Sequence, residues 1–186
     1  MTALTSARRA SIQSAACTFL AGTGARTIDF GVLLRLCRDA GIDVLDADLR
    51  DINGELRREG EKWRIYLNRE DSHARKLFTL AHELGHYVLH ADCGRTFVES
   101  HFTRLQTPGR DNSREEREAN TFAAGLVMPA GVIDSLLADR RPTAQQVLAL
   151  AKRFGVSPLA MVHRLGALGY PVPPAAADPS PARQVG

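Results

Sequence analysis

Two histidines four residues apart, with a glutamate beside the first, are the side chains of this chain best suited to chemistry. They are His82, Glu83 and His86, in the order His-Glu-Leu-Gly-His. Residues four apart lie on one face of a helix, so both imidazoles can reach one ion from the same side. The glutamate can reach a water on that ion without occupying a coordination position. The pattern therefore predicts metal-assisted hydrolysis, with Zn²⁺ activating the water and Glu83 as the general base.

A catalytic zinc site needs a third protein ligand and one open position. His90 continues the four-residue series, but it lies about 6 Å further along the same helix and cannot close around the ion. Ser113–Glu116 fits a capping box, which assigns Glu116 to a helix end. Glu118 precedes an apolar run and should point inward, although spacing alone leaves a solvated helix edge equally open. The full set of candidates is His90, Asp92, His101, Glu115, Glu116 and Glu118.

The elements that must position these residues are mostly helices. Apolar spacing predicts a helix that begins after Asp29 and ends at Gly41, and a second helix from Arg75 to about Ala91 that carries the motif. Between them, β-forming residues and turns in 42–68 predict a small, mainly antiparallel sheet. Further helices are expected at 113–128, 132–138, 143–154 and 157–168. The expected fold class is α+β.

Composition favours a soluble, cytoplasmic protein. Hydrophobic residues make up 44% of the 186 residues and charged residues 24%, and the formal net charge of +3 is too small to indicate nucleic-acid binding. No apolar run approaches the roughly 20 residues that span a bilayer, and the N-terminus is too polar for a signal peptide. Three scattered cysteines predict a reduced protein without disulfides, and Cys93 as a metal ligand is a weaker alternative.

Two segments together resemble the ImmA/IrrE family of metallopeptidases. One is Phe78–His86 followed by Leu89-His90, and the other is Glu118–Ala124 followed by Leu126–Pro129. The resemblance covers roughly residues 28–170. It implies a zincin-like core with His82, His86 and Glu118 as zinc ligands; this ligand set suits zinc without excluding Mn²⁺ or Fe²⁺.

The same resemblance implies a regulatory endopeptidase. Family members inactivate a helix-turn-helix repressor of the XRE type, often encoded beside them, in a stress or mobile-element response. Some relatives carry their own N-terminal helix-turn-helix domain, for which this chain has no room, so the repressor is expected to be a separate protein. The resulting division is an N-terminal segment 1–27, a metallopeptidase core 28–130, a helical subdomain 131–170 and a disordered tail 171–186.

Two other functions compete with a peptidase. One is a non-proteolytic antirepressor or antitoxin-like partner, against which the intact general base Glu83 argues. The other is DNA binding through Thr143–Leu168, which resembles a helix-turn-helix but offers only His163 and Arg164 as polar readers. Asn120 could orient a ligand or form a structural hydrogen bond between helix and loop, and spacing leaves both open. Tyr66, Tyr87 and His101 are candidate oxyanion stabilisers that no pattern in the sequence favours.

Overall fold

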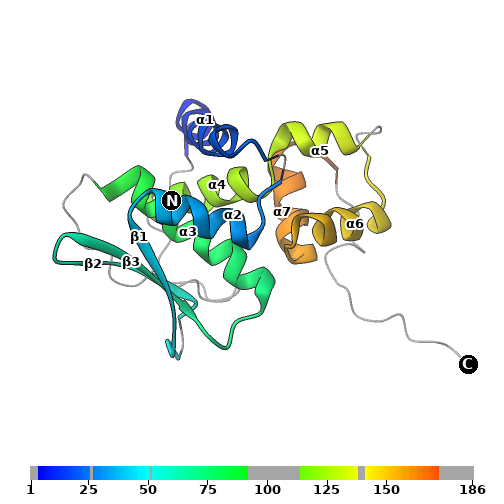
Figure 1. Ribbon diagram of the computed structural model, residues 1–186. Helices are drawn as coiled ribbons and strands as arrows, with labels where there is room; N and C mark the ends of the chain where they lie inside the picture. Colours follow the sequence, from blue (N-terminus) through cyan, green and yellow to red (C-terminus); the bar gives the residue numbers. More distant parts are fainter. Residues whose placement is uncertain (1–3, 26, 51, 92–113, 138–140, 172–186) are drawn as a thin grey trace, which may run out of the picture.

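The computed structural model describes residues 4–25, 27–50, 52–91, 114–137 and 141–171. Within them, seven helices and three strands confirm the α+β class. The sheet lies at one end of the molecule and helices α6 and α7 at the other, with α3 and α4 between them (Figure 1). The elements are α1 (Ser6–Thr23), α2 (Phe30–Asp39), β1 (Ile42–Ala47), β2 (Gly54–Glu59), β3 (Lys62–Asn68), α3 (His73–His90), α4 (Arg114–Val127), α5 (Ala130–Leu136), α6 (Ala144–Phe154) and α7 (Pro158–Ala167).

The sheet is mixed, where the sequence predicted a mainly antiparallel one. Its order is β1-β3-β2; β3 pairs with β2 in antiparallel fashion and with β1 in parallel. The reason is the segment between β1 and β2, which passes the end of β3 and places the two outer strands on opposite sides. Asn68 holds this crossing, because its side-chain amide donates to the carbonyls of Arg50 (3.2 Å) and Ile52 (2.9 Å).

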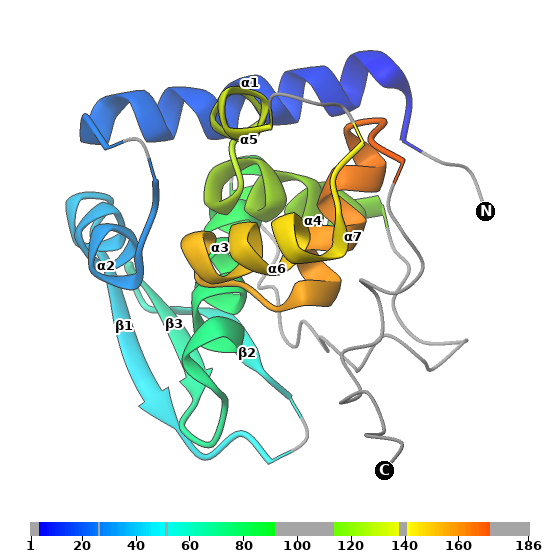
Figure 2. The same ribbon diagram turned by 90° about the vertical axis from the view of Figure 1, so that its right-hand side faces the viewer.

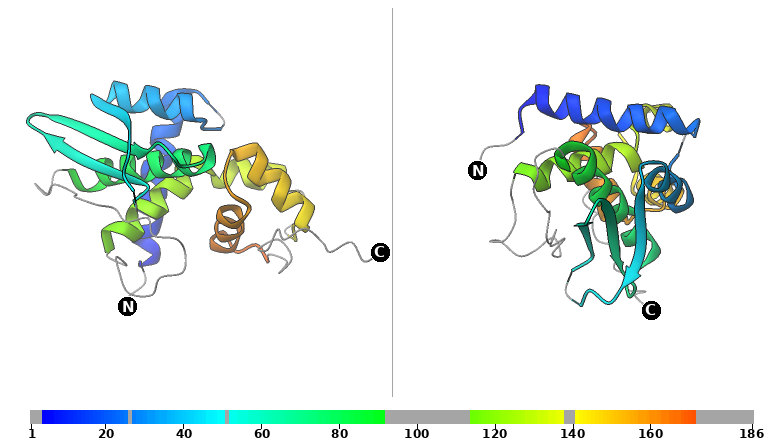
Figure 3. Two further views of the ribbon diagram at one scale, coloured as in Figure 1. Left: turned by 90° about the horizontal axis from the view of Figure 1, so that it is seen from below. Right: turned by 60° about the vertical axis from the view of Figure 1, so that its left-hand side comes forward.

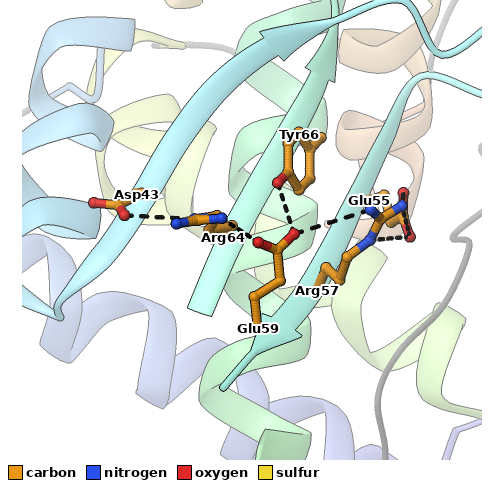
Figure 4. Close-up of polar contacts among 6 residues, drawn as sticks. All are labelled: Asp43, Glu55, Arg57, Glu59, Arg64 and Tyr66. Carbon is orange, nitrogen blue, oxygen red and sulfur yellow. Dashed lines mark hydrogen bonds and ion pairs between the residues drawn. The ribbon is translucent and has the colours of Figure 1, made fainter. Parts of the chain in front are cut away.

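Alternation along the strands separates an apolar face from a polar face. Leu56, Ile65 and Leu67 are buried in the core, on the face that α3 covers. The opposite face carries a polar network (Figure 4), in which Arg64 pairs with Asp43 and Glu59, and Tyr66 donates to Glu59 at 2.7 Å. Tyr66 therefore belongs to this polar face and not to the side of the sheet that α3 occupies.

Helix α4 is packed between α3 on one side and α1 on the other (Figures 2 and 3). Ile12 and Ala16 of α1 are fully buried. Gly125 of α4 permits the close approach, because a Cβ added there would lie 3.3 Å from the Cβ of Ala16. The helical part of the predicted N-terminal segment thus contributes to the core. None of the described helices combines the length and apolarity needed to cross a membrane.

The last two helices begin and end close to where the sequence placed them. Thr143 and Gln146 form a capping box at the start of α6, and Gly155 ends that helix with a positive φ of 65°. Ser157 caps α7, with Pro158 at its first position. On α7, Arg164 is buried and donates from Nε to the carbonyl of Met128 at 2.9 Å. Burial lowers the pKa of Arg164 to about 10.

Candidate metal centre

Helix α3 presents the motif from the inside of the molecule. Ser72 caps its N-terminus, and the residues from Leu77 through His86 are almost all buried. His82 is fully buried, and Glu83 and His86 are each 1% exposed. Fully buried histidines and carboxylates are costly unless they bind one another or a metal. The burial of three such residues on one helix therefore indicates that they contact one another or a bound ligand.

The two imidazoles converge with one carboxylate from α4. His82 Nε2 and His86 Nε2 lie 3.0 Å apart, and the carboxylate of Glu116 lies 3.1 Å from the first and 3.0 Å from the second. These three residues form the group that could hold a metal ion within the described parts of the chain. Ligands about 2.0–2.1 Å from a tetrahedral zinc stand about 3.3 Å apart, so the donor set fits zinc with little movement.

The close approach of α3 and α4 depends on the glycine inside the motif. A Cβ on Gly85 would lie 3.2 Å from the carbonyl oxygen of Ala119 and 3.1 Å from Cδ1 of Phe122. Any larger residue would meet the backbone of α4. Gly85 therefore allows α4 to lie near enough for Glu116 to reach both histidines.

Glu116 is held ionised in this arrangement. Burial opposes its charge, but hydrogen bonds with His82 and His86 outweigh burial and lower the pKa of Glu116 to about 2. A metal ligand must be deprotonated when the ion binds. The carboxylate is therefore in the right state to complete a His₂Glu donor set near neutral pH.

The structure places Glu118, the third ligand that the sequence analysis favoured, outside the cluster of His82, His86 and Glu116. Glu118 is 1% exposed, but it binds two arginines: Arg8 of α1 donates from Nε at 2.9 Å and from Nη2, and Arg114 donates from Nε at 2.8 Å. The hydrogen bond from Arg8 is the main reason that the pKa of Glu118 falls to about 2. Glu118 thus ties α1 to α4 and does not join the histidine cluster.

Helical geometry explains why Glu116 and Glu118 have different neighbours. Two residues two positions apart differ by about 200° around a helix, so Glu116 and Glu118 point in nearly opposite directions. Ala119, one turn after Glu116, faces Gly85 of α3, whereas Gly125, two turns after Glu118, faces α1. Helix α4 therefore has two buried faces. The 116–119–123 spacing places Glu116 on the face of α4 toward α3, and the capping-box interpretation of Glu116 obscured this pattern.

Glu83, the predicted general base, lies beside the cluster and against the start of β2. A Cβ on Gly54 would overlap the Thr79 side chain and lie 3.4 Å from Oε1 of Glu83. A glycine at this position lets the strand backbone approach the carboxylate of Glu83. The result is a buried glutamate one residue from His82, on the helix that carries both histidines.

The remaining candidates lie around the centre. His90 is 7% exposed, 3.8 Å from Glu118 Oε2, and outside the three-residue cluster; burial and the neighbouring His86 lower its pKa. The Tyr87 hydroxyl approaches the carbonyl of Ala40 at 3.5 Å. Asn120 lines a cavity one turn from Glu116. Asp92, Cys93 and His101 lie outside the described residues, as do the Ser113 cap and most of the predicted tail.

Known proteins provide three comparisons. Residues 37–166 match the family model Peptidase_M78, described as the IrrE N-terminal-like domain. The chain is 33% identical over 104 residues to a radiation response metalloprotease IrrE from Deinococcus deserti, covering 54% of this chain and 35% of that protein. A solved transcriptional regulator from Mycobacterium tuberculosis superposes with a TM-score of 0.58 at 20% identity, over 90% of this chain and 49% of the other.

These matches agree with the fold and with the composition of the cluster. The chain spans about a third of the curated relative it matches and about half of the solved structure. The structural likeness concerns the fold alone, whereas the family model covers most of the chain and includes α3, α4 and both helices that follow α5. The chain belongs to the Peptidase_M78 family of IrrE-like metallopeptidase domains.

Proposed function

We propose that this chain is a zinc-dependent endopeptidase whose metal is held by His82, His86 and Glu116. The observation that carries this proposal is the buried Glu83 beside a His₂Glu cluster. A purely structural metal site is closed by protein ligands and has no use for a general base. Three protein ligands leave one position for water or substrate, as a hydrolytic site requires.

The chemistry divides between the metal and Glu83. When bound, zinc lowers the pKa of a coordinated water and polarises the carbonyl of the scissile peptide. Glu83 accepts a proton from the attacking water at its carboxylate. It then delivers that proton to the nitrogen of the leaving amine, so the carboxylate is restored at the end of the turnover. The buried position of Glu83 keeps bulk water from competing for the proton.

The sheet offers a place for an extended substrate. Strand β2 lies at one edge of the sheet and, among the described elements, pairs only with β3. It begins at Gly54, in contact range of Glu83. A peptide added along an edge strand would gain main-chain hydrogen bonds and pass the general base. A protein substrate with an accessible extended segment fits this arrangement.

We infer that the substrate is a helix-turn-helix repressor of the XRE type and that cleavage relieves repression in a stress or mobile-element response. The ImmA/IrrE resemblance supports this inference, and so does the radiation response named for the Deinococcus relative. DNA binding by the chain itself is less well supported, because Arg164, one of its two predicted readers, is buried against Met128. A cytoplasmic location follows from a repressor substrate.

The test is cleavage of the repressor encoded beside this chain by purified protein supplied with zinc or, separately, manganese. Wild type should cut the repressor at a defined bond, and Glu83→Gln should lower the rate by about 10²–10⁴-fold while keeping its metal. Glu70→Gln, an exposed glutamate before α3, is the matched control and should cleave normally.

Two outcomes would contradict the proposal. Release of the repressor from its DNA without cleavage, unchanged in Glu83→Gln, would identify an antirepressor. Direct binding of the chain to the operator in the absence of repressor would identify a DNA-binding protein.

A further inference from the structure

A cavity of ≈ 540 Å³ adjoins the candidate metal centre without containing any of its ligands. It is bounded by residues of α1, the first half of α3, α4 and α7. Thr79 and Asn120 lie at its edge, one helical turn from Glu83 and Glu116 respectively. Pockets of about 300–1,000 Å³ are typical of ligand sites. The cavity therefore lies one helical turn from the centre.

The lining combines an apolar floor with a basic rim. Phe78, Met128 and Val156 provide apolar surface, and small residues such as Ala124 and Ala160 leave the space open. Arginines and a histidine also line it, but no aspartate or glutamate does among the described residues. These basic residues are Arg9, Arg75, His163 and Arg164.

The basic residues are not equivalent. Arg164 is buried and already donates to the carbonyl of Met128 at 2.9 Å. Arg9 and Arg75 are exposed, and the nearest acidic partner of Arg75 is Asp71 at a loose 3.8 Å. Because a single exposed pair contributes little, Arg75 can change partner at small cost. The rim thus has two arginines able to receive a carboxylate from a bound molecule.

We propose that this cavity binds the substrate segment on one side of the scissile bond, and that it selects a large apolar side chain followed or preceded within a few residues by an acidic one. The apolar side chain would lie between Ala124 and Ala160, and the carboxylate would pair with Arg9 or Arg75. The inference rests on the proposed peptidase function, because a substrate bound at Glu83 and Glu116 needs to extend only one helical turn to reach Thr79 and Asn120 of the cavity. Apolar burial supplies affinity, and the charge pair supplies register.

The experiment measures binding without cleavage, so that it does not depend on turnover. A Glu83→Gln protein carrying zinc is immobilised and exposed to a random peptide library, and the bound peptides are sequenced. The same selection is made with Ala124→Leu and Ala160→Leu added separately, since leucine at either position fills the cavity from a different helix. Arg75→Glu and Arg9→Glu each reverse the charge of one exposed arginine that lines the cavity. Exposed residues of α6 provide matched controls, Ala149→Leu and Arg153→Glu.

The proposal expects peptides enriched in one large apolar residue and one acidic residue at a fixed spacing. Each cavity-filling variant should reduce that apolar enrichment at least tenfold. At least one of the two charge reversals should replace the acidic preference with a basic one, and the controls should match the parent. Thermal melting and zinc content establish that each variant is folded.

A negative result can be assigned either to the proposed cavity or to the proposed peptidase function. Selected peptides that are unchanged by both filling variants, or no enrichment from any folded protein, would overturn the cavity assignment. A small-molecule site would also show as no peptide enrichment. Enrichment of the expected peptides by a wild type that cleaves none of them would overturn the peptidase function and leave the cavity assignment intact.

Discussion

The two buried faces of α4 carry two glutamates with opposite uses. Glu116 faces α3 and lies about 3 Å from the Nε2 atoms of both histidines of the motif. Glu118 faces α1 and accepts hydrogen bonds from Arg8 and Arg114. The pKa of each falls to about 2, although the partners differ. A buried, ionised carboxylate is therefore not diagnostic of a metal ligand; the identity of the groups facing it decides its role.

The partners explain the difference in chemical terms. Imidazoles can exchange a carboxylate contact for a metal ion, since their ring nitrogens and the carboxylate oxygens are ligands that zinc accepts. Guanidinium groups remain charged and do not coordinate metals, so a glutamate bound to two of them is satisfied without an ion. The face toward α3 thus carries groups that can accept an ion, and the face toward α1 carries groups that hold a helix in place.

Among substitutions that leave both glutamates in place, the largest effect that separates the two faces should come from their glycines. Gly85→Ala places a methyl against the backbone of Ala119, where neither helix can yield locally, so α4 should move away from His82 and His86. We expect zinc affinity to fall at least about tenfold, the scale seen when a group that supports a ligand is lost. Isothermal titration of the metal-free protein with zinc measures this change.

Gly125→Ala is the matched control for Gly85→Ala. Its methyl meets the Cβ of Ala16 at 3.3 Å, a side-chain contact that a small shift of α1 relieves. The gain of about 1 kcal/mol in helix propensity offsets the crowding, so stability should change by less than about 1 kcal/mol. Zinc affinity should remain that of wild type. Equal loss of affinity in both variants would mean that the two faces are not independent.

A smaller effect is expected from Arg8→Ala, which leaves the buried Glu118 with Arg114 alone. The free energy of unfolding should fall by about 1.5–3 kcal/mol, the usual contribution of a hydrogen bond to a charged group. Urea denaturation followed by circular dichroism measures it, with the exposed Arg35→Ala as a control. Zinc affinity of the folded protein should change by less than about threefold; a loss as large as that of Gly85→Ala would join Glu118 to the metal centre.

Local patterns in the sequence predicted most of the elements that position the site. The helix carrying His82 and His86, the caps at Thr143 and Ser157, and the strands within 42–68 are present. These features depend on neighbours in sequence: helical spacing, capping side chains and alternation. Strand pairing depends on residues far apart, so the crossing between β1 and β2 that makes the sheet mixed was not predicted.

The place of Glu116 beside the two histidines was not predicted, for a related reason. Choosing between Glu116 and Glu118 requires knowing which helices pack on α4, and the weak amphipathic pattern of residues 9–20 gave no sign that α1 would cover one side. Without α1, the metal site is the one buried polar group that an inward-pointing Glu118 could be expected to contact. Packing of Ile12 and Ala16 against α4 supplied the missing information.

The most direct test of this account compares zinc binding by Glu116→Gln and Glu118→Gln, two substitutions of the same chemistry on the two faces of α4. The account predicts that Glu116→Gln loses zinc affinity by more than about 100-fold, because it removes a ligand rather than a supporting group. Glu118→Gln should bind zinc as wild type does while unfolding more easily. Retention of zinc by Glu116→Gln together with its loss in Glu118→Gln would contradict the account and restore Glu118 as the ligand.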